Sequence, residues 1–153
     1  MAGKVAGFTL IEILVAISIL GVLLAIAIPS YTYWQNERQL TSEIRKVNAF
    51  VQQERTRAFS TSQQIDLKVD GNKEICSEEM ATGQKRCLQT EYVFASSDDS
   101  AINSNGVFEP DSSRIYIKDQ DLVERYNPRF SCIKLSTIRA RLGQYENGEC
   151  TPE

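Results

Sequence analysis

The chain opens with an almost uninterrupted apolar run. From Phe8 to Ile28 there are 21 residues and a single charge, Glu12. As an α-helix this run would be about 31 Å long at roughly 1.5 Å per residue, which matches a bilayer hydrocarbon core of about 30 Å. The run therefore predicts a membrane-spanning helix.

The helical pattern continues beyond this run. Apolar residues recur every three or four positions, at Leu40, Ile44, Val47, Val51 and Ala58. This spacing predicts an amphipathic helix that ends at about Phe59. Four charged residues are expected to lie off its apolar stripe: Arg38, Arg45, Glu54 and Arg55.

Two residues mark weak points of this long helix. Pro29 removes one backbone hydrogen bond and disfavours the helical conformation at Ile28, so we expect a kink there. Gly21 is the other weak point.

After residue 62 the hydrophobic period changes from helical spacing to alternation. Residues 65–69 alternate apolar and polar side chains, which predicts a half-buried strand. Further strands are predicted at 89–95, 114–118, 130–136 and 138–142, with a turn-rich segment at 96–106. One long helix followed by short strands predicts an α+β fold, with the helix packed across an antiparallel sheet.

Composition argues against an enzyme. The 153 residues carry a net charge of −3, four cysteines and no histidine, so the commonest general base is missing. There is no P-loop and no G-x-S-x-G motif. The pairs Glu78-Glu79 and Asp98-Asp99 are interpreted as solvated loop residues, and a calcium site between Asp98 and Asp111 is disfavoured by its spacing. No cofactor or metal is expected.

Three interpretations of the N-terminus compete. A secretory signal peptide would place cleavage after "AIA" at 25–27, but its apolar core is usually only about 7 to 15 residues. An uncleaved signal anchor explains the length but not Glu12, whose carboxylate costs about 2 to 3 kcal/mol inside a bilayer. A charge inside such a segment indicates function.

The third interpretation accounts for Glu12. Residues "GFTLIE" at 7–12 resemble the type IV prepilin signature. The resemblance implies cleavage between Gly7 and Phe8 by a prepilin peptidase, followed by N-methylation of Phe8. Glu12 lies four residues from the new cationic amine, on the same helix face. In the family this carboxylate pairs with the amine of a neighbouring subunit during filament assembly, and helicity can be lost between Gly21 and Pro29.

The resemblance implies a domain organisation and a location. Residues 1–7 would be a leader, 8–29 a transmembrane and assembly helix, and 30–153 a periplasmic, later extracellular, pilin domain. Before assembly the protein would cross the inner membrane once, in contact with its lipids, with its N-terminus cytoplasmic. Its partners would be the assembly platform, the major pilin and other minor pilins.

Within the pilins the chain resembles the GspH/FimT/FimU-type minor pilins and pseudopilins. The similar segments are "QQERTRAFS", "IDLKV" and the C-terminal "SCIKLSTIRARLGQYENGEC". This branch implies a structural subunit in or near the pilus tip. The alternatives are a DNA-capturing minor pilin and a minor pseudopilin of a type II secretion system.

Four cysteines allow three pairings. An exported domain lies in an oxidising compartment where disulfides persist. We favour the two local pairs over the crossed ones: Cys76–Cys87 would close a polar excursion of the chain, and Cys132–Cys150 would tie the C-terminus to a strand.

Basic residues gather near the C-terminus. Arg139 and Arg141 are two residues apart, so in a strand they would face one side and could contact successive phosphates, with Lys134 nearby. The branch's Gly-Arg-x-Arg pattern has isoleucine at its glycine position here, Ile138. We therefore favour a solvated face, or pairing with Glu146, Glu149 or the acidic loops, over DNA contact.

Overall fold

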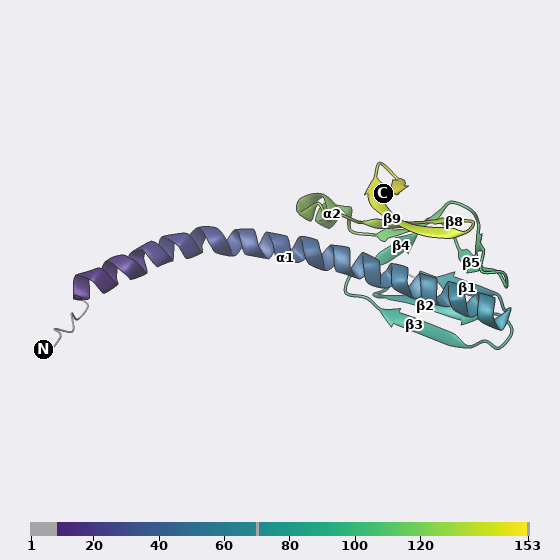
Figure 1. The fold of residues 1–153 in the computed structure, drawn as a ribbon. Coiled ribbons are helices and arrows are strands. Elements are labelled where there is room, and N and C mark those ends of the chain that lie inside the picture. Colours follow the sequence, from purple (N-terminus) through teal and green to yellow (C-terminus); the bar gives the residue numbers. More distant parts are fainter. Residues whose placement is uncertain (1–8, 70, 153) are drawn as a thin grey trace, which may run out of the picture. The chain divides into compact units, whose positions relative to one another are not determined.

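The computed structural model describes residues 9–69 and 71–152. Its elements, in chain order, are α1 (Leu10–Thr61), β1 (Ile65–Lys68), β2 (Glu74–Glu79), β3 (Lys85–Gln89), β4 (Phe94–Ser96), β5 (Ser100–Ile102), β6 (Phe108–Glu109), β7 (Ser113–Ile117), α2 (Gln120–Tyr126), β8 (Cys132–Ser136), β9 (Arg139–Glu146) and β10 (Glu149–Pro152). One long helix followed by antiparallel strands is the predicted α+β architecture (Figure 1).

The chain divides into two compact units, residues 1–35 and 36–153. In the first, α1 begins at Leu10 and runs through Gly21 and Pro29. The apolar side chains described in this unit are exposed. In length and composition α1 can cross a bilayer, since an 18-residue window of it has a mean hydropathy of 2.8 and none of that window is buried.

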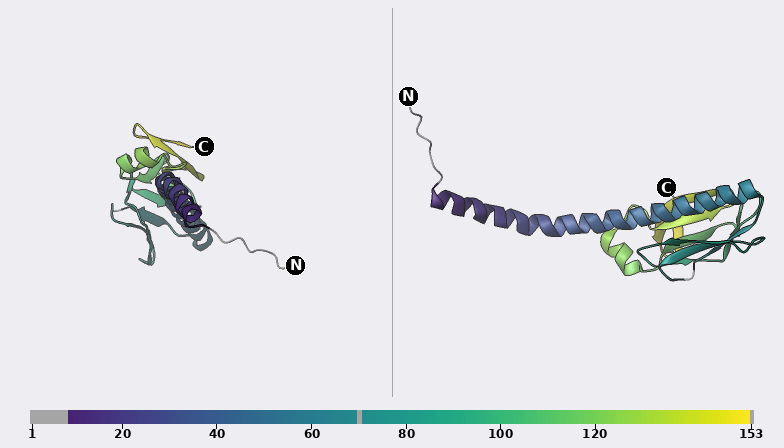
Figure 2. Two further views of the ribbon diagram at one scale, coloured as in Figure 1. Left: turned by 90° about the vertical axis from the view of Figure 1, so that its left-hand side faces the viewer. Right: turned by 90° about the horizontal axis from the view of Figure 1, so that it is seen from below.

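The second unit contains two antiparallel sheets of five strands each, where the sequence predicted one. The first sheet has the strand order β3-β2-β1-β5-β6, and the second has the order β10-β9-β8-β7-β4. Residues 36–61 of α1 run along these sheets, as two further views show (Figure 2). Both sheets and this part of α1 contribute to a single hydrophobic core.

The apolar stripe of α1 supplies one wall of this core. Leu40, Ile44, Val47, Val51 and Ala58 are all fully buried, as the helical spacing predicted. The first sheet contributes Ile65, Leu67, Ile75, Ile102 and Phe108, and the second contributes Phe94, Ile115, Ile117, Ile133 and Leu135. Burial of this stripe explains why residues 36–61 stay helical although they are polar on the opposite face.

The strand predictions were correct in part. β1, β7, β8 and β9 occupy the expected segments, whereas the strand expected at 89–95 is wrong for residues 90–93, which separate β3 from β4. Five strands and one short helix were not expected: β2, β3 apart from Gln89, β5, β6, β10 and α2. Asp119 caps α2 by accepting a hydrogen bond from the Leu122 amide, 3.1 Å away.

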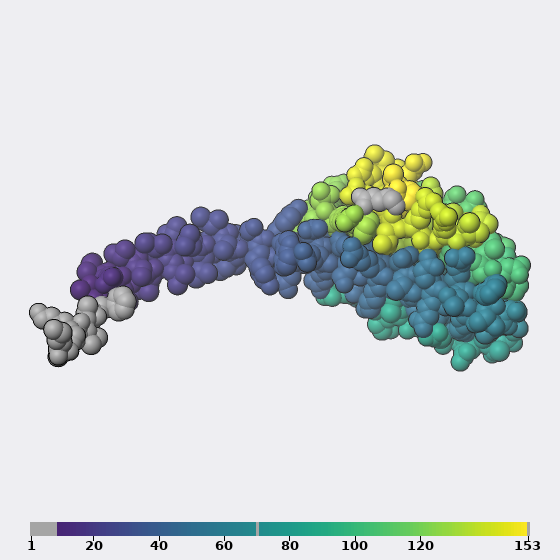
Figure 3. Space-filling model, viewed as in Figure 1, coloured from purple at the N-terminus to yellow at the C-terminus, as the bar shows by residue number. Residues whose placement is uncertain are grey.

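A C-terminal hairpin completes the second sheet. β9 and β10 are joined by Asn147-Gly148, both with positive φ, as a tight hairpin turn requires. β10 passes so close to Gly143 that a Cβ there would lie 2.3 Å from the Thr151 carbonyl oxygen. In the space-filling view these C-terminal strands lie beside the second half of α1 (Figure 3).

Candidate assembly segment and head-domain surfaces

The start of α1 is capped by a side chain. Thr9 precedes the helix, and the Glu12 amide donates to the Thr9 hydroxyl at 3.3 Å and to the Thr9 carbonyl at 3.2 Å. Thr-x-x-Glu is the spacing of a capping box, in which the threonine satisfies a free amide of the first turn. Sequence reasoning missed Thr9, although this four-residue pattern identifies it. Gly7 and Phe8 lie outside the described residues.

Glu12 lies exposed on an apolar helix surface. Its neighbours along that surface are Ile13, Ala16 and Ile17. Among the residues that the structure describes, no cation forms an ion pair with Glu12. A carboxylate in such surroundings is costly in a bilayer, and carboxylates inside membrane-spanning segments almost always pair with another polar group.

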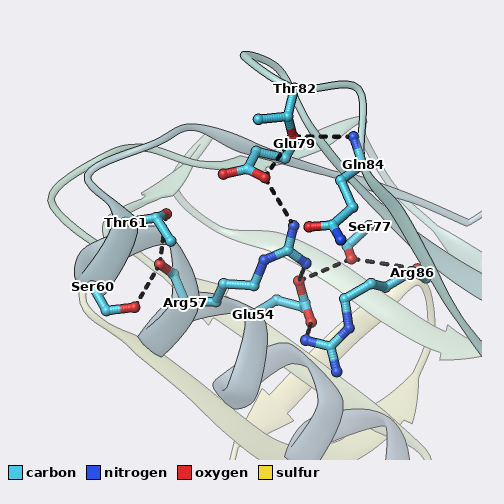
Figure 4. Close-up of polar contacts among 9 residues, drawn as sticks. All are labelled: Glu54, Arg57, Ser60, Thr61, Ser77, Glu79, Thr82, Gln84 and Arg86. Carbon is cyan, nitrogen blue, oxygen red and sulfur yellow. Dashed lines mark hydrogen bonds and ion pairs between the residues drawn. The ribbon is translucent and has the colours of Figure 1, made fainter.

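A buried glutamate joins the end of α1 to the β2–β3 hairpin. Glu54 is fully buried, and its Oε2 accepts hydrogen bonds from Arg57 at 2.8 Å and from Ser77 at 2.9 Å (Figure 4). Arg86 Nη1 forms an ion pair with Oε1 at 3.0 Å, without the alignment of a hydrogen bond. Two guanidinium groups thus neutralise one buried carboxylate.

The same network reaches the turn of the hairpin. Arg57 also pairs with Glu79 at 3.3 Å, and Glu79 accepts a hydrogen bond from the Thr82 hydroxyl at 2.7 Å. Two sequence expectations were therefore wrong. Glu54 does not lie off the stripe but within it. The pair Glu78-Glu79 lies in β2 rather than in a loop, and of the two Glu79 is buried. Glu54 and Glu79 are buried because arginines from α1 and β3 supply counter-charges.

Two disulfides constrain the second unit. Cys76 pairs with Cys87 between directly opposite positions of β2 and β3, and Cys132 of β8 pairs with Cys150 of β10. These are the local pairs that the sequence favours. The segment between Cys76 and Cys87, expected to be an irregular excursion, is a regular hairpin. Glu74 lies beside the first pair, but disulfide sulfurs are not thiolate metal ligands.

Basic residues gather on one face of the second sheet. Lys134 lies directly opposite Arg141 in the β8–β9 ladder, and Arg139 lies two residues from Arg141, so all three share that face. Arg139 and Arg141 are exposed, and within residues 9–69 and 71–152 none of the three forms an ion pair.

Arg114 of β7 extends this row, because it lies opposite Lys134. Sequence reasoning missed it, because only the strand register places it there. Its guanidinium donates to the Gly148 carbonyl at 2.7 Å, so it also fixes the turn of the β9–β10 hairpin.

Comparison with family models identifies the N-terminal segment. Residues 3–28 match the prokaryotic N-terminal methylation motif. No curated protein and no solved structure matched the chain. The match covers Gly7, Phe8 and Glu12 and ends at Ile28, the last residue of the apolar run. Together with the long helix and the antiparallel strands that follow, the prokaryotic N-terminal methylation motif at residues 3–28 supports a type IV pilin-like prepilin.

Proposed function

We propose that this protein is a minor pilin, a non-enzymatic structural subunit of a type IV pilus that joins the filament through residues 8–29. The methylation motif on an exposed apolar helix carries this proposal. Residues 1–7 act as the leader, and residues 30–153 form the domain that is exported. Similarity of the chain's sequence to the GspH/FimT/FimU-type branch supports a place in or near the tip, where the subunit helps initiate assembly and connects other minor pilins to the fibre.

The assembly role of Glu12 follows from its charge and position. Cleavage after Gly7 creates a cationic amine on Phe8, and an amine of one subunit pairs with Glu12 of another inside the bundle of helices. Buried without a partner, the carboxylate is costly; paired, it selects one axial position. A subunit whose Glu12 pairs with the amine of another subunit must join the filament after that other subunit.

Replacing Glu12 tests the proposal. Glu12→Ala should insert into the membrane at least as well as the wild type, because a desolvation cost disappears. It should enter filaments poorly, measured by immunoblotting of sheared pili from cells that also express the other pilins. Ser18→Ala, on the same helix, is the control. Equal incorporation of Glu12→Ala and wild type would refute the assembly role.

Processing gives an independent test of the leader. Gly7→Leu should block cleavage, because the peptidase accommodates a small residue at this position, and the protein should keep Lys4 and migrate as the longer form. N-terminal sequencing that begins at Phe8 in this variant would exclude a prepilin.

DNA capture is the second candidate function. It is favoured by the row of Lys134, Arg139 and Arg141, because like charges placed opposite one another destabilise a sheet unless something compensates for them. Neighbouring side chains of this row are about 5 to 7 Å apart along and across the strands, a spacing that matches successive phosphates of a DNA strand. Such binding would be indifferent to sequence and would weaken steeply with salt.

A gel shift at low salt decides between the two candidates. If DNA is a ligand, the full chain in neutral detergent should shift it, and Arg139→Ala/Arg141→Ala should abolish the shift. Lys68→Ala/Lys85→Ala removes two positive charges from the first sheet and should preserve it. If the wild type shifts no DNA, the capture role is excluded and the structural role remains.

A further inference from the structure

A second group of arginines lies where α1 meets the loop between α2 and β8. Four residues on one face of α1, spaced three and four apart, are Arg38, Thr41, Ser42 and Arg45. Arg129 approaches them from the loop. Together with Glu37 these residues line a hollow of about 460 Å³, named here the arginine pocket.

Two of the three arginines of the pocket stack on an aromatic ring. The guanidinium carbons of Arg45 and Arg129 lie 5.5 Å and 5.2 Å from the centre of the Phe130 ring, which is itself buried. Stacking on an aromatic face orients a guanidinium without using its N–H donors. Two positive charges from segments far apart in the sequence are thereby brought together.

Arginines outnumber carboxylates among the residues that line the pocket. Three guanidinium groups face one carboxylate, that of Glu37, in a chain whose net charge is −3. Arg45 forms no ion pair with any carboxylate in the described part of the chain. Concentrating like charges costs free energy, which an anion in the pocket would offset.

A buried hydroxyl lies in the wall of this pocket. Thr41 is only 9% exposed, and its Oγ1 has no hydrogen-bond partner among the described residues. An unsatisfied buried polar group is uncommon in a folded protein and costs free energy. The exposed Ser42 hydroxyl lies beside it on the helix.

We propose that the arginine pocket binds a phosphate group. Planar guanidinium forks bind phosphate oxygens in pairs, and hydroxyl donors complete such sites. The phosphate can belong to a free anion or to a lipid headgroup. Arg38 follows Trp34 by four residues in the sequence, and aromatic and then basic residues after an apolar run are typical of segments that contact headgroups. The proposal does not depend on the pilus role.

Two probes test the site and distinguish the sources. In the first experiment, the full chain in maltoside detergent is titrated with inorganic phosphate by calorimetry, and chloride at equal ionic strength is the control. In the second, the chain is incubated with dioleoylphosphatidylglycerol, and bound lipid is detected by native mass spectrometry. We expect Arg45→Gln to weaken binding about tenfold, the effect of one lost charge-assisted contact. Arg125→Gln, which also removes one exposed helical arginine, should leave binding unchanged.

Each outcome has a defined meaning. Binding of both probes, weakened by Arg45→Gln and Arg38→Gln but not by Arg125→Gln, supports a site that takes a lipid phosphate, whereas binding of inorganic phosphate alone supports a site for the free anion. Because Arg45 packs on Phe130, Arg38→Gln is measured in parallel, and circular dichroism checks the fold of both variants. Failure of both probes to bind, or equal weakening by Arg125→Gln, overturns the proposal.

Discussion

Glu54 connects the end of α1 to the first sheet through polar contacts. Its carboxylate has no exposed surface, and it contacts two arginines and a serine from three elements. Removing one partner of a buried ion pair leaves charge uncompensated in a poorly solvated place, which costs far more than losing an exposed pair.

We expect Glu54→Ala to lower the free energy of unfolding by about 3 kcal/mol. This value is at the lower end for a broken buried ion pair, because the Arg86 side chain is partly solvated. Glu54→Gln should cost less, since the amide still accepts a hydrogen bond from Ser77. Urea unfolding followed by near-ultraviolet circular dichroism measures both variants. Glu78→Ala breaks only the exposed pair with Lys68 and is the control; an equal loss there would contradict the buried network's importance.

At the scale of elements, three different kinds of contact hold the β9–β10 hairpin in the second sheet. A disulfide joins β10 to β8, Arg114 holds the turn, and Tyr116 of β7 stacks on Tyr145 of β9 with ring centroids 4.1 Å apart. Burial, and next the hydrogen bond with Tyr116, raises the pKa of Tyr145 above its ordinary value of about 10.

This pKa shift predicts a loss of stability at alkaline pH. The folded protein favours the neutral phenol of Tyr145. The stability that this preference contributes is fully present below pH of about 10 and is lost as pH rises through the folded-state pKa. Thermal melts between pH 9 and 12 should therefore fall less steeply in Tyr145→Phe than in the wild type. Tyr31→Phe, an exposed position in the first unit, should follow the wild type. Identical profiles for Tyr145→Phe and wild type would contradict the shift.

At the scale of the whole molecule, the hydrophobic core and both disulfides belong to one unit. Every residue of the core comes from Leu40 or later, and all four cysteines lie beyond residue 75. Residues 9–35 contribute exposed apolar surface instead. Folding of the second unit and anchoring of the first therefore rest on different residues.

We expect residues 36–153, expressed without the apolar segment and oxidised, to fold as a monomer. The large apolar surface is then absent, while each disulfide still contributes about 2 to 4 kcal/mol by restricting the unfolded chain. Size-exclusion chromatography and mass mapping of the cysteines check this, with a reduced sample as the control. Aggregation of the oxidised fragment would show that its fold requires the N-terminal segment.

The sequence by itself determined the elements whose signals are local. The 21-residue apolar run, Glu12 and the residues around Gly7 predicted the membrane-capable helix and the methylation motif, because these properties depend only on neighbouring residues. The stripe from Leu40 to Ala58 predicted one wall of the core for the same reason, and the alternating strands predicted the α+β class.

Only the tertiary structure decided which polar residues are buried and which charges lie together. Glu54 and Glu79 are buried because Arg57 and Arg86 reach them from other elements, and no local pattern carries that information. The division into two sheets, the row from Arg114 to Arg141 and the arginine pocket likewise depend on strand register and on contacts between segments far apart in the chain. Such contacts form only when the chain folds on itself, so spacing along the sequence does not specify them.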